Sequence, residues 1–355
     1  MGPLYNLAVP KGSTVLVTGA NGLLGSHIAD QFLEYGYKVR GTVRDVDKNS
    51  WLSTVFDKKY GKGVFELFEV SDMASQGAFI EAVKGASIMV HSATVMSFEF
   101  DPHKVIPPAV DGALNALVAA CAEPTVQRFV FTSSAMAANT SHPGTPGIKV
   151  TDESWNEDAI TKAWAGPPYT IERANDVYAA SKALAEQEVW KYYRKHQNER
   201  PDLVINTVLP NYNIGRLIDP IHQGFRSSSI MPVLLWKGQV TDLHRTLPRQ
   251  YSVDYQDTAR LHLAAGIFEH VQGERIFGFA HSFCWDMVLE LLREIEPEKA
   301  FPPNFSSEQD PNEIEPRDKA EQLLRDLGRP GWTSLEESVR GVVGDLYVVE
   351  KAIHQ

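Results

Sequence analysis

The residue pair with the clearest chemical meaning is Tyr178 and Lys182, which stand four positions apart in the segment YAASK. The surrounding pattern is helical, so we expect both side chains on one face of a helix. A phenol can deliver a proton to an oxygen that is being reduced, but its ordinary pKa of about 10 is too high for neutral pH. A lysine ammonium at about 4 Å is worth about 4 kcal/mol at an effective dielectric near 20. The pair therefore predicts a Tyr178 pKa of roughly 7.

A strand end supplies a third polar group. Residues 129–132 are typical of a buried strand, and Ser133 and Ser134 follow it directly. A hydroxyl at this place can orient a substrate oxygen, and we assign that role to Ser134, with Ser133 as the alternative. Together with Tyr178 as general acid and Lys182, it predicts the reduction of a carbonyl group by hydride transfer.

A glycine-rich turn near the N-terminus indicates where the hydride donor binds. The predicted strand 14–18 runs into the pattern G-x-x-G-x-x-G, and a helical segment follows. Such glycines permit a tight turn, close approach of a pyrophosphate and close packing of helix on strand. We expect the phosphates on the free N–H groups at the helix start. The predicted cofactor-binding residues here are Gly19, Asn21, Gly22, Leu23, Leu24 and Gly25.

The end of the second predicted strand, residues 37–44, indicates which dinucleotide binds. Arg44 ends this strand and Lys48 follows four positions later. Cations suit the 2′-phosphate of NADP, whereas an NAD site has an acidic side chain there. Asp45 is a contrary sign, but the two cations favour NADPH. Further cofactor contacts are predicted after the next two strands, at Asp72, Met73, Ser92, Ala93 and Thr94.

The chain resembles the extended short-chain dehydrogenase/reductases in the motifs TGANGLLG, VRGTVRDVDK, FTSSA and YAASK, which begin at residues 18, 39, 131 and 178. TDESWN, VLPNYNIGRLIDP and LGRPGWTSLEESV, from 151, 208 and 327, make it similar to fungal and yeast NADPH-dependent aldehyde/carbonyl reductases, which are related to dihydroflavonol reductases. One departure is Arg216, which follows Gly215 where the family usually has proline.

The resemblance implies a set of site residues. The family's serine, tyrosine and lysine fall on Ser134, Tyr178 and Lys182, and its 2′-phosphate ligands on Arg44 and Lys48. It also implies cofactor contacts at Pro210, Asn213, Ser227 and Ser228. The substrate-binding residues that we predict are Met96, Phe98, Ser134, Asn211, Tyr212 and Trp236, with core packing as the alternative for the apolar ones.

Short β-rich runs alternate with helical patterns over the first two-thirds of the chain, which predicts an α/β fold. We expect a Rossmann doubly wound parallel sheet with a smaller C-terminal substrate lobe. The predicted NADP-binding Rossmann domain is 1–210, completed by about 250–272, and the predicted substrate-binding lobe is 211–249 with 273–355. The polar segment 306–321 is expected to be a solvated loop and helix start.

Net charge, cysteine content and hydropathy limit the classes of partner and the compartment that we expect. The net charge of −11 argues against a nucleic acid or an anionic membrane. Two cysteines fit a reducing compartment, no apolar run approaches the roughly 20 residues of a membrane span, and no metal-ligand spacing occurs. We expect a cytoplasmic monomer or homodimer that acts on a small aldehyde or ketone. The alternatives are a sugar-nucleotide epimerase or dehydratase and a non-catalytic regulator that senses the cofactor.

Overall fold

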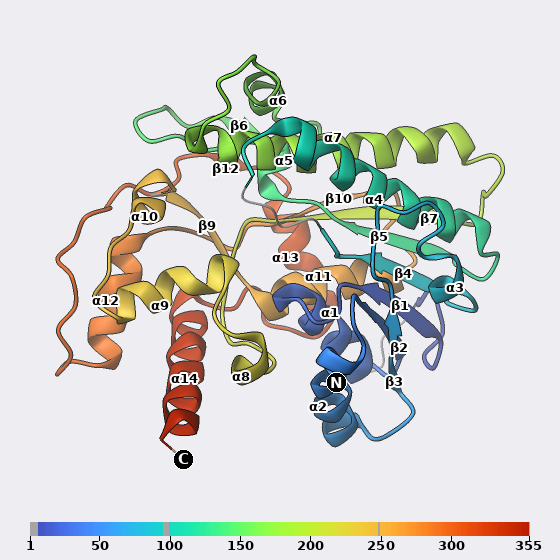
Figure 1. Ribbon diagram of the computed structural model, residues 1–355, viewed down its shortest axis with the longest axis horizontal. Coiled ribbons are helices and arrows are strands. Elements are labelled where there is room, and N and C mark those ends of the chain that lie inside the picture. Colours follow the sequence, from blue (N-terminus) through green and yellow to red (C-terminus); the bar gives the residue numbers. More distant parts are fainter. Residues whose placement is uncertain (1–5, 95–98, 248, 355) are drawn as a thin grey trace.

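A seven-stranded parallel sheet is the centre of the computed structural model, which describes residues 6–94, 99–247 and 249–354 (Figure 1). Its strands are β1 (Thr14–Thr18), β2 (Lys38–Val43), β3 (Phe65–Glu69), β4 (Ile88–His91), β5 (Arg128–Thr132), β7 (Val204–Pro210) and β10 (Arg275–Gly278). They lie in the order β10-β7-β5-β4-β1-β2-β3. The chain order reverses between β1 and β4, and ligands bind at the carboxyl ends of strands at such a switch point. The predicted Rossmann fold is confirmed.

Helices cover both faces of this sheet (Figure 1). One face carries α1 (Leu23–Glu34), α2 (Ser50–Tyr60), α11 (Tyr255–Ile267) and α13 (Arg317–Asp326), and the other carries α3 (Ile80–Val83), α4 (Pro102–Ala122) and α7 (Ala174–His196). Strand side chains alternate between the faces. In β1, Val15 and Val17 pack into the core beneath α1 and α11, whereas Leu16 packs into the core beneath α4. A strand buried on both sides reads as a continuous apolar run.

Helix α4 corrects one expectation from the sequence. Residues Pro102–Ala122 are long and apolar enough to cross a membrane by length and composition, although we expected no such run. Half of its most apolar stretch is buried, because Ala113, Ala116 and Leu117 pack between the sheet and α7. Tertiary packing accounts for the apolar composition of this helix.

The smaller lobe is built around a three-stranded sheet with the order β11-β9-β8. Its strands are β8 (Tyr212–Ile214), β9 (Arg249–Asp254) and β11 (His281–Cys284). Its helices are α8 (Pro220–Gln223), α9 (Ile230–Trp236), α10 (Asp242–Thr246), α12 (Trp285–Ile295) and α14 (Leu335–Ile353). The short α5 (Ala135–Ala138), α6 (Glu157–Ala163) and the pair β6 (Lys149–Val150) and β12 (Glu313–Ile314) lie over the junction between the lobes (Figure 1).

The topology differs from the predicted division of the chain at two strands. The Rossmann sheet is completed by β10, whereas β9, within the predicted 250–272 segment, belongs to the small sheet. The buried amide of Asn206 explains the placement of β10: it donates to the carbonyls of Ala265 and Val271 and accepts from the N–H of Glu274, which directs the following strand along β7. A strand pattern in the sequence does not show which sheet the strand joins.

Candidate active site

The glycine turn fits its predicted task. Gly22 is the N-cap of α1, so no side chain occupies the first N–H groups of that helix. Gly19 has a φ of +66°, which glycine adopts without strain. A Cβ on Gly25 would lie 2.2 Å from the Gly19 carbonyl oxygen, so only glycine allows α1 to pack this closely on the turn. The open helix start is suited to a pyrophosphate.

Thr18, at the end of β1, connects this turn to the next strand. Its Oγ1 accepts hydrogen bonds from the N–H groups of Ser92 and Ala93, at 3.1 and 3.0 Å. It also bonds Nδ1 of His91 at 3.0 Å, and burial lowers the pKa of that histidine to about 3. The histidine is neutral, and its Nδ1 accepts the hydroxyl proton because the Oγ1 lone pairs serve the two N–H groups. Ser92, Ala93 and Thr94 therefore follow β4 at the carboxyl edge, beside the glycine turn, as predicted.

The two predicted 2′-phosphate ligands are placed differently. Arg44 is exposed at the end of β2. Lys48 forms an ion pair with Asp45 at 2.7 Å, and the Lys48 N–H bonds the same carboxylate. Asp45, the contrary sign in the sequence, is thus occupied by Lys48. Arg44 is the better placed of the two cations to meet a phosphate.

The residues that follow β3 and β4 are only partly described. Asp72 is exposed, and its carboxylate accepts from the Ala74 N–H and the Ser75 hydroxyl, which lowers its pKa. Met73 packs against Gly112 of α4. Its predicted contact with the cofactor stays a prediction, as does that of Asp72. Met96 and Phe98 lie outside the described residues.

The three predicted catalytic side chains meet at the end of β5. Ser134 is the N-cap of α5, and its Oγ accepts from the Met136 N–H at 3.2 Å. The same hydroxyl interacts with the Tyr178 phenol from α7. One turn further along α7, the buried Lys182 donates from Nζ to the Thr132 carbonyl at 2.9 Å. A phenol, a hydroxyl and an ammonium thus lie together at the carboxyl edge of the sheet.

The predicted pKa of Tyr178 is wrong for this structure. Burial raises the pKa of the phenol above its ordinary value, and the Ser134 hydroxyl only partly opposes this. Burial lowers the pKa of Lys182 to about 8, against the attraction of Glu186, which raises it. The Lys182 ammonium is directed to the Thr132 carbonyl, so its charge is not applied directly to the phenol. Desolvation has the largest effect on both groups.

Sequence reasoning missed Glu186, which lies one turn beyond Lys182 on α7. It is fully buried and accepts hydrogen bonds from the hydroxyls of Ser133 and Thr207, at 2.6 and 2.9 Å. Arg275 of β10 completes an ion pair with it at 2.8 Å. The i, i+4 spacing from Lys182 was the available signal in the sequence. Ser133, our alternative for substrate orientation, is therefore occupied by a carboxylate beneath the site.

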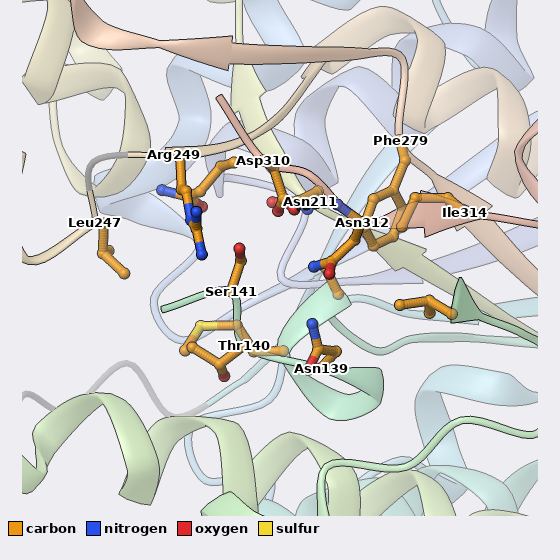
Figure 2. Close-up of a pocket in the computed structure, with 14 residues that line it drawn as sticks. Asn139, Thr140, Ser141, Asn211, Leu247, Arg249, Phe279, Asp310, Asn312 and Ile314 are labelled. Carbon is orange, nitrogen blue, oxygen red and sulfur yellow. Dashed lines mark hydrogen bonds between the residues drawn. The ribbon is translucent and has the colours of Figure 1, made fainter. Parts of the chain in front are cut away.

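A small cavity of about 30 Å³ is lined in part by Ala135 and Met136, which directly follow Ser134 in the sequence (Figure 2). Its lining includes Met136 and Asn139, from the segment that follows Ser134, and Asn211, which follows β7. Figure 2 shows Arg249 and Asp310 on the side opposite Thr140 and Ser141.

The polar side of this cavity comes from residues of the predicted substrate-binding lobe that we did not assign to the site. Asp310, like Asn312 and Ser306, is buried, so these residues depart from the solvated loop that we expected for 306–321, whereas half of the segment is exposed and α13 begins in it at Arg317. Arg249 is 2% exposed, and its Nε has no hydrogen-bond partner among the described residues. A buried donor without a partner at a cavity wall is suited to a polar ligand atom.

The predicted site residues from Pro210 onward separate into polar or strand-end residues and aromatic residues. Pro210 ends β7 at the carboxyl edge, and Asn213 of β8 accepts from the Thr258 hydroxyl at 2.6 Å. Ser228 bonds the Tyr255 hydroxyl at 2.7 Å, and Ser227 is exposed with a φ of +51°.

Two of the three aromatic residues predicted for the pocket, Tyr212 and Trp236, are core residues, which was the alternative for the apolar ones; the third, Phe98, lies outside the described residues. Tyr212 packs on Phe283 and Trp285, and its hydroxyl donates to the Ser228 carbonyl. Trp236 is 4% exposed and packs on Phe301. The structure therefore corrects both assignments, because an aromatic residue in an apolar pattern serves a core as readily as a pocket.

Among the described residues, no group of three His, Cys, Asp or Glu side chains could hold a metal ion. The arrangement offers instead an open helix start for phosphates and a proton donor at the neighbouring strand end. The model of the NAD dependent epimerase/dehydratase family matches residues 15–212. The chain belongs to this family. Within it, the chain is an extended short-chain dehydrogenase/reductase that uses a nicotinamide dinucleotide.

Its relatives include reductases matched over almost their whole length. Aldehyde reductase 2 of Sporidiobolus salmonicolor is 41% identical over 345 residues, which are 97% of this chain and 99% of that protein. Ketoreductase adrE of Penicillium rubens is 38% identical over 342 residues, 95% of this chain and 97% of that protein. Among solved structures, yeast methylglyoxal/isovaleraldehyde reductase Gre2 complexed with NADPH has a TM-score of 0.78 at 22% identity, covering 95% of this chain and 99% of that chain. That last likeness confirms the fold.

Proposed function

We propose that this protein is an NADPH-dependent reductase of aldehydes and ketones. The observation that carries the proposal is the meeting of Ser134, Tyr178 and Lys182 at the edge of the sheet where the glycine turn opens. The relatives named as aldehyde reductase and ketoreductase support the same chemistry, because they match over nearly the whole chain.

The chain's own residues supply the proton side of the reaction. The reduced nicotinamide supplies a hydride to the carbonyl carbon when it is bound. The Tyr178 phenol, whose pKa lies above its ordinary value, is protonated at neutral pH and can donate to the carbonyl oxygen. The Ser134 hydroxyl interacts with that phenol and can hold the same oxygen. The resulting phenolate forms one helical turn from the Lys182 ammonium, whose positive charge can favour it at that range although the ammonium donates to the Thr132 carbonyl; a proton from solvent then restores the phenol.

The choice of NADPH over NADH rests on Arg44. This side chain is exposed at the end of β2, where the 2′-phosphate of NADP would lie in a Rossmann site. A guanidinium can form paired hydrogen bonds with a phosphate. The cavity beside Met136 and Asn211 is the proposed place of the substrate's remainder, with Phe279 as an apolar wall and Arg249 as a polar one.

Replacement of Tyr178 by phenylalanine tests the function. We expect Tyr178→Phe to bind NADPH as the unchanged protein does and to lose most turnover, since only the proton-donating hydroxyl is removed. The measurements are the NADPH dissociation constant and the fall of NADPH absorbance with a panel of aldehydes and ketones. A variant that keeps its turnover would refute the acid role.

Two alternatives predict different results from the same measurements. A sugar-nucleotide epimerase would retain its dinucleotide through turnover and consume none. A cofactor-sensing regulator would bind NADPH and reduce nothing. Net consumption of one NADPH for each carbonyl reduced supports the reductase over both.

A further inference from the structure

A segment of the smaller lobe, Asp219–Ser229, lies across the glycine turn; we call it the strap. From α8, Gln223 donates from Nε2 to the Gly22 carbonyl at 3.3 Å and to the Ser26 hydroxyl of α1 at 3.0 Å. The ring of His222 stacks on Trp51 of α2, with 5.2 Å between the ring centroids. The strap therefore contacts the Rossmann domain at the glycine turn, at α1 and at α2.

The end of the strap is held firmly. The Arg226 N–H donates to the Ser229 Oγ at 2.9 Å, and the Ser229 hydroxyl donates back to the Arg226 carbonyl at 2.8 Å. Ser229 is only 1% exposed. Ser228 is fixed by Tyr255 at 2.7 Å. Ser227, between Arg226 and Ser228, has a φ of +51°, which a residue with a Cβ adopts only where surrounding contacts impose it. The backbone of Arg226 is thus positioned by buried partners, although its side chain is exposed.

The Arg226 guanidinium points to the turn. Its Nη2 donates to the Asn21 carbonyl at 3.2 Å, within the loop between Gly19 and Gly22. In the described parts of the chain, no carboxylate forms an ion pair with it. This is notable in a chain of net charge −11, where Arg249, for example, is paired with a carboxylate. A guanidinium has five donors, and one neutral carbonyl leaves most of them available.

We propose that Arg226 binds the pyrophosphate of the nicotinamide dinucleotide, so that the smaller lobe supplies the cation that the glycine turn lacks. The glycine turn and the first turn of α1, residues 18–26, contain no basic residue. They offer a pyrophosphate only backbone N–H groups. A charge-assisted pair from Arg226 would complement them. This inference rests on the proposed cofactor site. It gives the two arginines different ligands: Arg226 binds the pyrophosphate, which NADPH and NADH share, and Arg44 binds the 2′-phosphate, which only NADPH carries.

A crossed binding experiment tests this division. The probes are NADPH, NADH and adenosine 2′-monophosphate, which carries the 2′-phosphate without the pyrophosphate. We expect Arg226→Gln to raise the dissociation constants of NADPH and NADH about tenfold each and to leave that of adenosine 2′-monophosphate unchanged. Arg44→Gln should weaken NADPH and adenosine 2′-monophosphate and spare NADH. Arg226→Lys, which keeps the charge and loses the planar fork, should fall between the unchanged protein and Arg226→Gln.

The matched control is Arg340→Gln on α14, which removes an exposed arginine paired with Glu336 and should alter no dissociation constant. Unfolding temperatures without cofactor verify that each variant is folded. Unchanged NADPH and NADH affinities in Arg226→Gln would overturn the proposal, and so would losses confined to the two 2′-phosphate probes. These are binding measurements: if the expected pattern appears but no carbonyl is reduced, the proposed function fails and the role of Arg226 stands.

Discussion

Removal of the charge on Glu186 should move the pH at which the enzyme loses activity. The carboxylate lies one helical turn from Lys182 and opposes the burial that lowers the lysine pKa to about 8. Residues at i and i+4 have Cβ atoms about 5–6 Å apart, and two charges at about 6 Å and an effective dielectric near 20 interact by about 3 kcal/mol, or about 2 pKa units. We therefore expect Glu186→Gln to lower the Lys182 pKa by about 1–2 units.

The sign of the effect on activity follows from the role of the lysine. Turnover needs the ammonium, so kcat/KM of the unchanged protein should fall as pH rises through about 8. In Glu186→Gln the fall should begin between about pH 6 and 7, which leaves roughly an eightfold deficit at pH 7.5 and almost none near pH 5.5. The assay is kcat/KM for one aldehyde between pH 5.5 and 9.

A structural role for Glu186 would give a different profile. Removing the carboxylate leaves the Arg275 guanidinium buried without its partner, which typically costs about 3–5 kcal/mol of stability. That loss should lower the unfolding temperature without moving the pH profile. Glu188→Gln, on the same helix but paired at the surface with Lys191, is the control and should change neither. A folded Glu186→Gln variant that still loses activity only near pH 8 would refute the reasoning.

Three further expectations concern the cofactor site and stability. Gly25→Ala should weaken NADPH binding at least tenfold, because its Cβ would lie 2.2 Å from the Gly19 carbonyl oxygen; titration that gives an unchanged dissociation constant would contradict this. Arg44→Ala should weaken NADPH far more than NADH, and equal losses in the two titrations would remove the 2′-phosphate assignment. His91 and His262 are buried neutral with pKa values of about 3 and about 4, so the unfolded chain binds more protons below about pH 6.5. The unfolding temperature should therefore fall as pH drops from 6.5 toward 4, and a flat profile would count against that burial.

The sequence predicted those parts of the site that lie within single short segments. The glycine turn joins one strand to one helix, and Tyr178 and Lys182 share one helix, so local spacing determines their relative positions. Ser134 was predictable because a strand end in a parallel sheet faces the crevice. The parallel arrangement of the sheet followed from the alternation of strands and helices.

The remaining parts depend on contacts between distant segments. Arg275 reaches Glu186 from 89 positions away, and Arg226 reaches Asn21 from 205 positions away, so no local pattern indicates either. The raised pKa of Tyr178 is an effect of desolvation, which depends on the packed structure. Trp236 was assigned to the pocket because aromaticity alone does not separate a cavity wall from a core.

The repeated passage of the chain between the lobes has a consequence for engineering. After β7 the chain enters the smaller lobe at β8, returns for α11 and β10, leaves again for β11 and α12, comes back for α13 and ends in the smaller lobe with α14. Neither lobe is one continuous piece of sequence, so no single truncation isolates either of them. A chimera that exchanges the substrate lobe with a relative would need several grafted segments with matched junctions, and thermal denaturation should show one cooperative transition rather than two.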